Sequence, residues 1–513
     1  MNKLDHVVGE EKSVDRLYHF IDGARSVGKN ERYGYVYNPS TGEETAVCPY
    51  ATAEEVDVAV EAAEQAFKGW KSTPVAKRVE ILFEFKSLLV KATEELAVMI
   101  GQESGKTITD AKGEISRAIE AVDFAMYAPH LLKGEHSSDV GGDINAFSIK
   151  QPLGVVTCIA PFNFPVMVPV AMSTMALACG NSVILKPSER VPNSALFISE
   201  LWKKAGLPAG VWSVVNGDKE AVDALITHPK VMAVSFVGST KVAETIYEKA
   251  SRHHKRVAAF GGGKNHMIIM PDADIDFAVT SFIGAAYGAA SQRCMALSVA
   301  MPVGEKTAKV FVEKLKRRVE ELKVGSYDDE EADFGPVITQ QAKDQVLKSI
   351  EGSLREGAKL CVDGRDPDVG RTTNGYYLGA TLLDRVTPDM EIYREEVFGP
   401  ARIVVHVNSL DEAINLVNEH EYGNGVTIFT QSGPAARKFT EEIEVGMVGV
   451  NVPIPIPVGY HNFGGWKRSK FGESHMFGPD TVRFFTKIKT VSERWPESKV
   501  NNDVAFDFPS NRN

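Results

Sequence analysis

The sequence predicts an α/β protein built on parallel sheets. Short apolar runs separated by helical patterns are typical of alternating strands and helices. In the first half of the chain the runs are 155–160, 183–185, 213–215 and 234–237, and the helical patterns between them are 166–179, 193–205 and 219–227. The alternation repeats in the second half, with expected strands at 299–302, 358–363, 403–407 and 425–430 and expected helices at 306–323, 339–354, 410–419 and 434–443.

Length and composition agree with this fold class and exclude some partners. The 513 residues are enough for two or three domains, and 43% hydrophobic with 24% charged residues is ordinary for a globular protein. The formal net charge of -11 argues against nucleic acid as a main partner, because phosphate binding needs a basic surface. The chain has no apolar run of about 18 residues, so we expect no membrane-spanning segment.

Cysteine usage and the N-terminus indicate a reducing compartment. The five cysteines are few, odd in number and far apart, so no disulfide framework is expected. Residues 1–9 mix acidic and basic side chains and lack the apolar segment of a signal peptide. We therefore expect a cytoplasmic protein, or a mitochondrial matrix protein if a transit peptide has been removed.

The N-terminal part of the chain is expected to be mainly helical after a start at residues 1–30 that is irregular or lightly structured. Residues 36–42 predict a short strand that enters a turn. Thr52 and Glu55 form a capping box ahead of an amphipathic helix that reaches Trp70. Strong helical patterns follow at 75–103 and 114–127.

Gly105-Lys106-Thr107 superficially matches a phosphate-binding P-loop. The first Gly of such a loop would be Gly101, which is one residue too close, and a helix rather than a strand precedes it. We therefore reject a nucleotide site at this point.

Three features are expected in the remaining chain. Asp272, Asp274 and Asp276 resemble helix caps rather than metal ligands, because no calcium-loop pattern follows them. Residues 275–290 then predict a helix of small residues. Near the C-terminus, residues 482–491 alternate well enough to be a strand.

Cys294 is a candidate nucleophile. The reactive form of Cys is the thiolate, and a neighbouring cation such as Arg293 lowers the thiol pKa. A helix N-terminus close to the thiol would also favour its ionisation. Most cysteines are buried small hydrophobic residues, however, so this pair alone is weak support for catalysis.

Polar residues follow the predicted strands of the first sheet, where ligands of parallel sheets bind. The Asn163 amide could donate to a developing oxyanion, although a turn Asn beside two prolines is the simpler interpretation. Lys186 and Glu189 come after the second strand. Ser239 and its neighbours begin the helix at 241–250, where free backbone N–H groups could bind phosphate.

Six segments in this order and spacing resemble the aldehyde dehydrogenase superfamily from about residue 35 to residue 495. They are Pro-Phe-Asn-Phe-Pro (161–165), Lys-Pro-Ser-Glu (186–189), Phe-Val-Gly-Ser-Thr (236–240), Gly-Gly-Lys-Asn (262–265), Cys294 and Glu-Glu-Val-Phe-Gly-Pro (395–400). The resemblance implies a Rossmann-type NAD domain, an α/β catalytic domain and a small β oligomerisation arm. It also implies a homodimer or homotetramer in which the C-terminal strand joins a neighbouring subunit.

The same resemblance divides the chain into parts. It implies a discontinuous NAD-binding domain, an arm in two pieces and one catalytic domain. The ranges are 15–136 and 155–261 for the NAD-binding domain, 137–154 and 478–495 for the arm, and 262–460 for the catalytic domain.

The resemblance also assigns roles to individual residues. Cys294 would be the nucleophile and Asn163 the oxyanion donor. Lys186 and Glu189 would hold the adenosine ribose of NAD, and Glu396 and Phe398 would contact the nicotinamide ribose and ring. The full set of implied NAD-binding residues is Ala160, Phe162, Lys186, Glu189, Arg190, Ser239, Gly261, Glu396 and Phe398. The Rossmann motif G-x-G-x-x-G is absent, but this superfamily binds NAD without it.

One branch of the superfamily, the CoA-acylating methylmalonate-semialdehyde dehydrogenases, shares further features with this chain. They are the segment Gln-Arg-Cys-Met-Ala-Leu-Ser (292–298), Lys-Asn-His (264–266) and Asn-Val-Pro-Ile-Pro (451–455). In that branch two arginines are thought to hold the substrate carboxylate, and Arg117 and Arg293 fit their positions. An Arg fork suits a carboxylate, because it gives paired charge-assisted hydrogen bonds. The branch uses coenzyme A as a cosubstrate and decarboxylates malonate or methylmalonate semialdehyde to an acyl-CoA.

Phe260 is the informative departure from hydrolytic aldehyde dehydrogenases. Aligning the Gly-Gly-Lys motif places Phe260 where those enzymes carry a Glu general base. A general base usually increases a reaction rate by about 10²–10⁴-fold. Its loss should therefore leave a thioester that water hydrolyses slowly and that the CoA thiol can attack. The alternative is a hydrolytic enzyme in which another carboxylate, such as Glu473, activates water.

Overall fold

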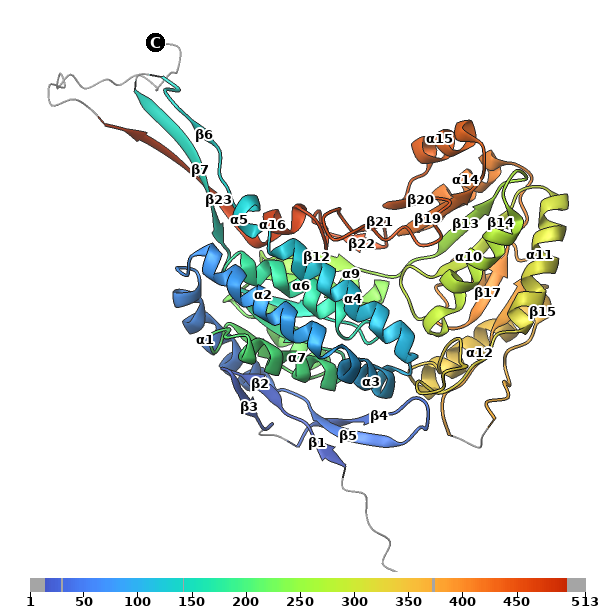
Figure 1. Cartoon of the computed structure of the whole chain (residues 1–513), viewed down its shortest axis with the longest axis horizontal. Coiled ribbons are helices and arrows are strands. Elements are labelled where there is room, and N and C mark those ends of the chain that lie inside the picture. Colours follow the sequence, from blue (N-terminus) through green and yellow to red (C-terminus); the bar gives the residue numbers. More distant parts are fainter. Residues whose placement is uncertain (1–13, 29–30, 142, 371–373, 496–513) are drawn as a thin grey trace, which may run out of the picture.

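Two large β-sheets, each covered by helices, make up most of the chain (Figure 1). The computed structural model describes residues 14–28, 31–141, 143–370 and 374–495. Expectations that concern residues 1–13, 29–30 or the tail after 495 lie outside these ranges. Within the described residues, no helix is long and apolar enough to cross a membrane.

The first sheet has eight strands, five of which are parallel. Its order is β22 (Lys470–Phe471), β12 (Arg256–Phe260), β11 (Val231–Val237), β8 (Val155–Ile159), β9 (Ser182–Lys186), β10 (Trp212–Val214), β2 (His19–Ile21) and β3 (Ala24–Ser26). The five central strands, β12 to β10, pair in parallel with one another. Each of the three outer strands, β22, β2 and β3, pairs antiparallel with its inner neighbour. Every residue of β8 and β9 is buried, as expected of parallel strands covered on both faces.

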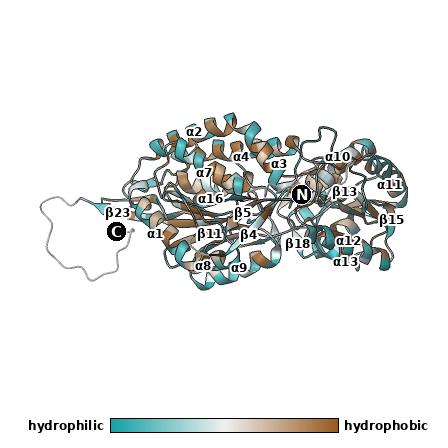
Figure 2. Cartoon of the chain, turned by 90° about the horizontal axis from the view of Figure 1, so that it is seen from below, coloured by the Kyte–Doolittle hydropathy of each residue, from teal (hydrophilic) through white to brown (hydrophobic). Residues whose placement is uncertain are grey.

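Helices cover both faces of this sheet (Figure 2). One layer contains α2 (Val75–Lys91), α3 (Thr93–Ser104), α4 (Ile108–Ala125), α6 (Met167–Ala178) and α7 (Pro192–Lys204). The opposite layer contains α1 (Ala53–Trp70), α8 (Lys219–Thr227) and α9 (Thr240–Arg252). The largest apolar core lies between the sheet and the first of these layers.

The second sheet has seven strands and its own apolar core. Its order is β15 (Lys359–Val362), β16 (Thr381–Asp384), β17 (Ala401–Val404), β14 (Leu297–Pro302), β13 (Asn265–Ile269), β19 (Gly425–Phe429) and β20 (Met447–Val450). All pairs are parallel except β15 with β16. The helices of this half are α10 (Ile275–Tyr287), α11 (Glu305–Glu320), α12 (Gln340–Arg355), α13 (Glu391–Arg394), α14 (Leu410–Glu419) and α15 (Gly433–Glu442).

Three small sheets complete the described structure. An antiparallel arm of β6 (His136–Ser137), β7 (Ile144–Pro152) and β23 (Thr486–Arg494) projects from the body (Figure 1). The others join β1 (Asp15–Arg16), β5 (Glu44–Pro49) and β4 (Tyr33–Tyr37), and β18 (Tyr422–Gly423) with β21 (Trp466–Lys467). Two short helices, α5 (Ala128–Leu131) and α16 (Asp480–Phe485), lie near the base of the arm (Figure 1).

Local signals explain several element boundaries. The predicted capping box is present, with Glu55 N donating to Thr52 Oγ1 and Thr52 N donating to Glu55 Oε2. Asp274 caps α10 by accepting from two backbone N–H groups. Both observations confirm the cap predictions for these residues.

Described residues before 29 form only the short strands β1, β2 and β3, which agrees with the lightly structured alternative expected there. Three other expectations about the bounds of elements were wrong. The helix expected at 75–103 is two helices divided at Ala92, and the one expected from residue 114 begins at Ile108, where Thr107 caps it. Residues 480–485 form a helix before the C-terminal strand begins at Thr486.

Candidate active site

Cys294 follows a strained turn at the end of α10. The helix expected at 275–290 ends at Tyr287, and Ala289, Ala290 and Ser291 adopt left-handed conformations with φ of 54°, 51° and 63°. A left-handed conformation costs about 1–2 kcal/mol for a residue with a side chain. Three successive residues in this conformation persist only where contacts with the surrounding structure hold the turn.

A buried guanidinium supplies one of those contacts. Arg402 is 1% exposed, and its Nε donates to Ala286 O (2.9 Å) and its Nη2 to Gly399 O (3.0 Å). Arg402 thereby joins the end of α10 to the segment that carries Glu396 and Phe398. No sequence pattern indicates a role for Arg402, because a lone Arg in a strand is normally a surface residue.

Two side-chain amides hold the backbone of the cysteine itself. Asn265 Nδ2 and Asn424 Nδ2 both donate to Cys294 O, at 2.8 and 3.0 Å. Asn265 belongs to two of the motifs that carry the family resemblance, but no sequence pattern indicates its contact with Cys294 or that of Asn424. Asn265 is the first residue of β13 and Asn424 directly precedes β19, so the second sheet fixes the backbone of Cys294.

The electrostatic surroundings do not favour a thiolate in the protein alone. Burial, together with the smaller effect of the Glu396 charge, raises the pKa of the Cys294 thiol to about 12, although the backbone N–H groups of Cys294 and Met295 act in the opposite direction. The expectation that Arg293 ionises the thiol was wrong, because its Nη2 is bound to Asp110 Oδ1 (2.5 Å). Nor does α10 present an N-terminus, since it approaches Cys294 with its C-terminal end.

Cys294 lies where two cavities meet. One has a volume of about 780 Å³ and the other about 180 Å³. Cys294, Asn163, Val237 and Gly261 line both of them. A molecule in either cavity can therefore reach the thiol.

The larger cavity contains most of the residues predicted to bind NAD. Its lining includes Ala160, Phe162, Lys186, Glu189, Ser239, Gly261, Glu396 and Phe398. The rings of Phe162 and Phe398 meet edge to face, with centroids 5.9 Å apart. Arg190 is outside this lining and more than a third exposed, so the cavity does not support its predicted role.

Charged groups in the larger cavity are arranged in pairs. Lys186 Nζ donates to Glu189 Oε2 (3.2 Å). Burial raises the pKa of Glu189, but Lys186 and local hydrogen bonds outweigh it and leave the pKa below its ordinary value. Glu396 Oε1 accepts from Gly263 N (3.2 Å), and burial raises the pKa of Glu396 to about 7.

The smaller cavity is a mainly apolar chamber whose lining also includes charged side chains. Its apolar lining consists of Phe164, Met167, Val168, Val237, Phe260, Met295, Ile454, Ile456, Phe463, Met476 and Phe477. Arg117 and Arg293 line the same chamber. Arg117 donates to Glu120 Oε2 (2.6 Å) and to Pro457 O (2.7 Å). The structure thus brings both predicted substrate arginines to the Cys294 chamber, each already bound to a carboxylate.

Phe260 faces the same chamber as Cys294. It is the last residue of β12, is 4% exposed and packs against Phe463, with ring centroids 6.4 Å apart. Glu473, the alternative base, is exposed and lines a separate cavity near the base of the arm. The position of Glu473 therefore argues against its activating a water molecule at the thiol.

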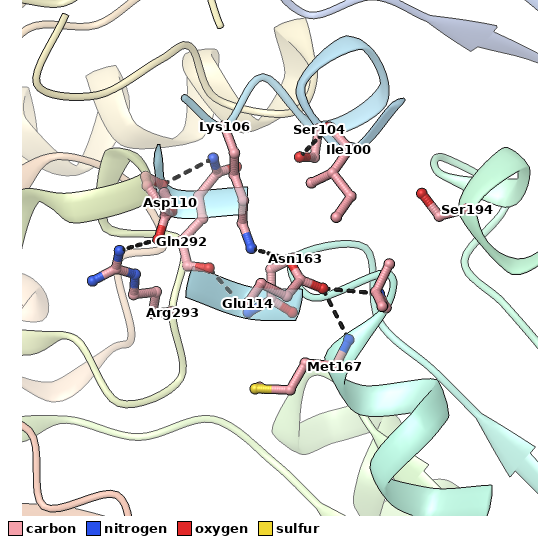
Figure 3. Close-up of polar contacts among 12 residues, drawn as sticks. Ile100, Ser104, Lys106, Asp110, Glu114, Asn163, Met167, Ser194, Gln292 and Arg293 are labelled. Atoms are coloured by element: carbon pink, nitrogen blue, oxygen red, sulfur yellow. Dashed lines mark hydrogen bonds and ion pairs between the residues drawn. The ribbon is translucent and has the colours of Figure 1, made fainter. Parts of the chain in front are cut away.

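Asn163 lies between the two halves of the site. It is 5% exposed, and its Nδ2 donates to Gln292 O (2.9 Å) in the segment that leads to Cys294 (Figure 3). Gln292 is in turn held by Ile338 N, which donates to its side-chain oxygen (3.0 Å). The predicted oxyanion donor and nucleophile are therefore connected through one hydrogen bond.

The chain belongs to the Aldehyde dehydrogenase family, whose sequence model matches residues 27–491. Malonate-semialdehyde dehydrogenase of Pseudomonas aeruginosa is 52% identical over 494 residues, which cover 96% of this chain and 99% of that protein. A protein of the same name from Halalkalibacterium halodurans is 45% identical, with 94% of this chain and 99% of the relative covered.

Solved structures agree with this membership. Methylmalonate-semialdehyde dehydrogenase from Oceanimonas doudoroffii superposes with a TM-score of 0.93 at 52% identity, covering 94% of this chain and 99% of that one. A candidate methylmalonate-semialdehyde dehydrogenase from Sinorhizobium meliloti, solved with NAD, gives a TM-score of 0.94 at 49% identity, covering 95% and 99%.

Proposed function

We propose that this protein is an NAD-dependent, CoA-acylating dehydrogenase of malonate or methylmalonate semialdehyde. It would oxidise and decarboxylate the semialdehyde to acetyl-CoA or propionyl-CoA through a thioester on Cys294. The observation that carries the proposal is the chamber that contains Cys294 and Phe260 together with Arg117 and Arg293. The names of the relatives from Pseudomonas aeruginosa and Oceanimonas doudoroffii support the same substrate class.

The larger cavity suits NAD. Lys186 and Glu189 would hold the adenosine ribose, Ser239 lies at the start of α9 where backbone N–H groups suit a phosphate, and Phe162 and Phe398 offer rings to the nicotinamide. The negative charge of Glu189 would repel a 2′-phosphate, which favours NAD over NADP. When bound, NAD supplies the acceptor for the hydride that leaves the substrate carbon.

The chain's own groups perform the remaining steps. The Cys294 thiol loses its proton and Sγ bonds to the aldehyde carbon, while the Asn163 amide and the Cys294 backbone N–H stabilise the oxyanion. Hydride loss converts this adduct into a thioester. Arg117 and Arg293 hold the substrate carboxylate until it leaves as CO₂, and its bonding electron pair passes to the α-carbon, which takes up a proton. The CoA thiolate then attacks the thioester and releases the Cys294 thiolate.

The test is NADH formation from each semialdehyde with and without CoA, with the products identified by mass spectrometry. We expect turnover to need CoA and to yield an acyl-CoA. Cys294→Ala should abolish NADH formation, and wild-type turnover by that variant would contradict the proposal. Equal turnover without CoA, with a free acid as product, would instead identify a hydrolytic aldehyde dehydrogenase.

The arm and the domain division extend the proposal to the assembly. We assign 15–136 and 155–261 to the NAD-binding domain, 262–460 to the catalytic domain, and 137–154 and 478–495 to an oligomerisation arm. Exposed apolar side chains on the arm, Ile149 (40%) and Ile488 (67%), support a homodimer or homotetramer in which the arm is covered.

A further inference from the structure

A buried ion pair lies beside the Cys294 chamber. Lys106 Nζ is 2.6 Å from Glu114 Oε2, and the two side chains are 4% and 0% exposed (Figure 3). Lys106 belongs to the Gly-Lys-Thr segment that superficially matched a P-loop, and Glu114 is in α4. Glu114 lines the chamber together with Cys294. The mechanism above uses neither of them.

The second oxygen of Glu114 holds the segment that follows Asn163. Glu114 Oε1 accepts from Val166 N (2.8 Å) and Met167 N (3.0 Å) (Figure 3). These are the first backbone donors of α6, whose N-cap residue offers no side-chain acceptor of its own. A carboxylate at a helix N-terminus also interacts favourably with the helix dipole. Lys106 Nζ lies over the Phe164 ring, 4.0 Å from its centroid.

Residues 163–167 are thus fixed from two sides. Glu114 and Lys106 hold the end that enters α6, and the hydrogen bond from Asn163 Nδ2 to Gln292 O holds the end that faces Cys294. We propose that Glu114 is a positioning residue, whose hydrogen bonds to the start of α6 hold the Asn163 amide at the oxyanion of the Cys294 adduct. This inference rests on the proposed function, in which Asn163 is the oxyanion donor.

Stability alone does not account for the pair. Removing two charges from water is costly, and replacing a buried ion pair by apolar side chains is often neutral or stabilising. What an apolar pair lacks is an acceptor for the two N–H groups at the start of α6. The length of the side chain at position 114, rather than its charge, is therefore the property that positions Asn163.

Two variants separate the effect of side-chain length at position 114 from the effect of charge. Glu114→Asp keeps the charge and shortens the side chain by one methylene group, so its carboxylate no longer reaches both N–H groups. The double variant Lys106→Met/Glu114→Gln removes both charges and keeps an amide oxygen at the original distance. We expect Glu114→Asp to slow single-turnover NADH formation by about tenfold or more, because small displacements of catalytic groups are costly. The double variant should stay within about threefold of the wild type.

Alkylation of Cys294 by iodoacetamide is the second measurement. This displacement forms no oxyanion, so we expect both variants to alkylate at the wild-type rate. A parallel loss of alkylation and NADH formation in Glu114→Asp would show a general disturbance of the site and overturn the proposal. Wild-type NADH formation by Glu114→Asp, or a loss confined to the double variant, would also overturn it.

Two further variants serve as controls. Glu103 is 3% exposed and likewise binds the N-terminus of a helix, α7: its Oε1 accepts from Asn193 N (2.6 Å), and its Oε2 accepts from Ser194 N (3.2 Å) and Ser194 Oγ (3.0 Å). Glu103→Asp should leave single-turnover NADH formation at saturating NAD unchanged. Asn163→Ala should lower it about 10²–10³-fold, as loss of an oxyanion donor does. If Asn163→Ala has no effect, the proposed function of Asn163 fails, whereas an effect of Asn163→Ala without one of Glu114→Asp refutes the positioning role alone.

Discussion

Phe260 shows how one side chain can decide the fate of an intermediate. Its ring fills the chamber wall where hydrolytic aldehyde dehydrogenases carry a Glu, and the carboxylates that line the chamber, Asp110 and Glu114, are both ion-paired. In the proposed mechanism, the thioester on Cys294 would therefore resist hydrolysis until the CoA thiolate attacks it.

Phe260→Glu should create hydrolysis. The new carboxylate would face the thioester and activate water, a contribution of about 10²-fold or more. The measurement is NADH and free-acid formation in the absence of CoA. Phe463→Glu is the matched control, since Phe463 lines the same chamber and packs on Phe260. A folded Phe260→Glu enzyme that makes no free acid would show that the missing base is not what prevents hydrolysis.

The Cys294 thiol should also respond to the charge of Glu396. This charge raises the thiol pKa, and the pKa of Glu396 is itself about 7, raised by burial and opposed by Gly263 N–H, Lys264 and Arg402. Glu396→Gln removes the charge, lowers the thiol pKa and leaves more thiolate at a given pH. We expect iodoacetamide to react about threefold faster with the variant at pH 8.5 in the absence of NAD.

The same comparison at lower pH provides the check. Below about pH 6 Glu396 is protonated in the wild type, so the two alkylation rates should converge. A rate difference that is constant from pH 6 to pH 9 would exclude a charge effect and indicate a change in the shape of the site.

At the scale of elements, the junction after α10 controls where Arg293 lies. A Cβ atom added to Gly288 would be 2.7 Å from Arg293 Nη1 and 2.9 Å from its Cζ. The backbone of Gly288 has φ -51° and ψ 141°, which any residue adopts. The lack of a side chain at position 288 therefore leaves space for the Arg293 guanidinium and is not required by the backbone conformation.

Gly288→Ala should displace Arg293 without unfolding the turn. We expect the KM for a carboxylated semialdehyde to rise about tenfold, with little change for propanal, which has no carboxylate. Gly284→Ala, within α10 four residues earlier, is the control, because an added Cβ there contacts nothing within 4 Å. Equal KM changes for the two aldehydes would mean that Arg293 does not recognise the carboxylate.

The order of the helices and strands could be predicted from local sequence patterns. The contacts between side chains that are distant in the sequence could not. Periodicity located the central strands and helices, because each pattern reports burial within a few residues. The pairing of Arg293 with Asp110, and of Glu114 with the start of α6, joins segments that only the fold brings together. Residue types identified Cys294, but its surroundings contradicted the simple expectation that the adjacent Arg ionises it.

For the whole molecule, the projecting arm should determine assembly. β23 pairs with β7 along nine positions and exposes Ile488, which lies opposite Lys150. Ile488→Glu should weaken a contact between subunits that buries this apolar surface. Light scattering after size exclusion should report a smaller assembly than the wild type.

A substitution on the same strand tests whether that effect is specific. Lys489→Glu changes the charge of the neighbouring position, whose partner in the register is Ile149. We expect it to change the assembly less than Ile488→Glu does. A monomeric wild-type protein would contradict the assignment of an oligomerisation arm.

The eight-stranded sheet has a consequence for how the chain is made. Its edge strand β22 lies at residues 470–471, whereas its neighbour β12 ends at Phe260. The seven-stranded sheet is formed entirely by residues that lie between these two strands. Translation proceeds at about 5–20 residues per second, so roughly 10–40 s separate the emergence of β12 from that of β22. The seven-stranded sheet can therefore form on the ribosome before β22 has been translated. During this interval the β12 edge of the eight-stranded sheet is unpaired, and an arrested nascent chain would expose that edge to other strands.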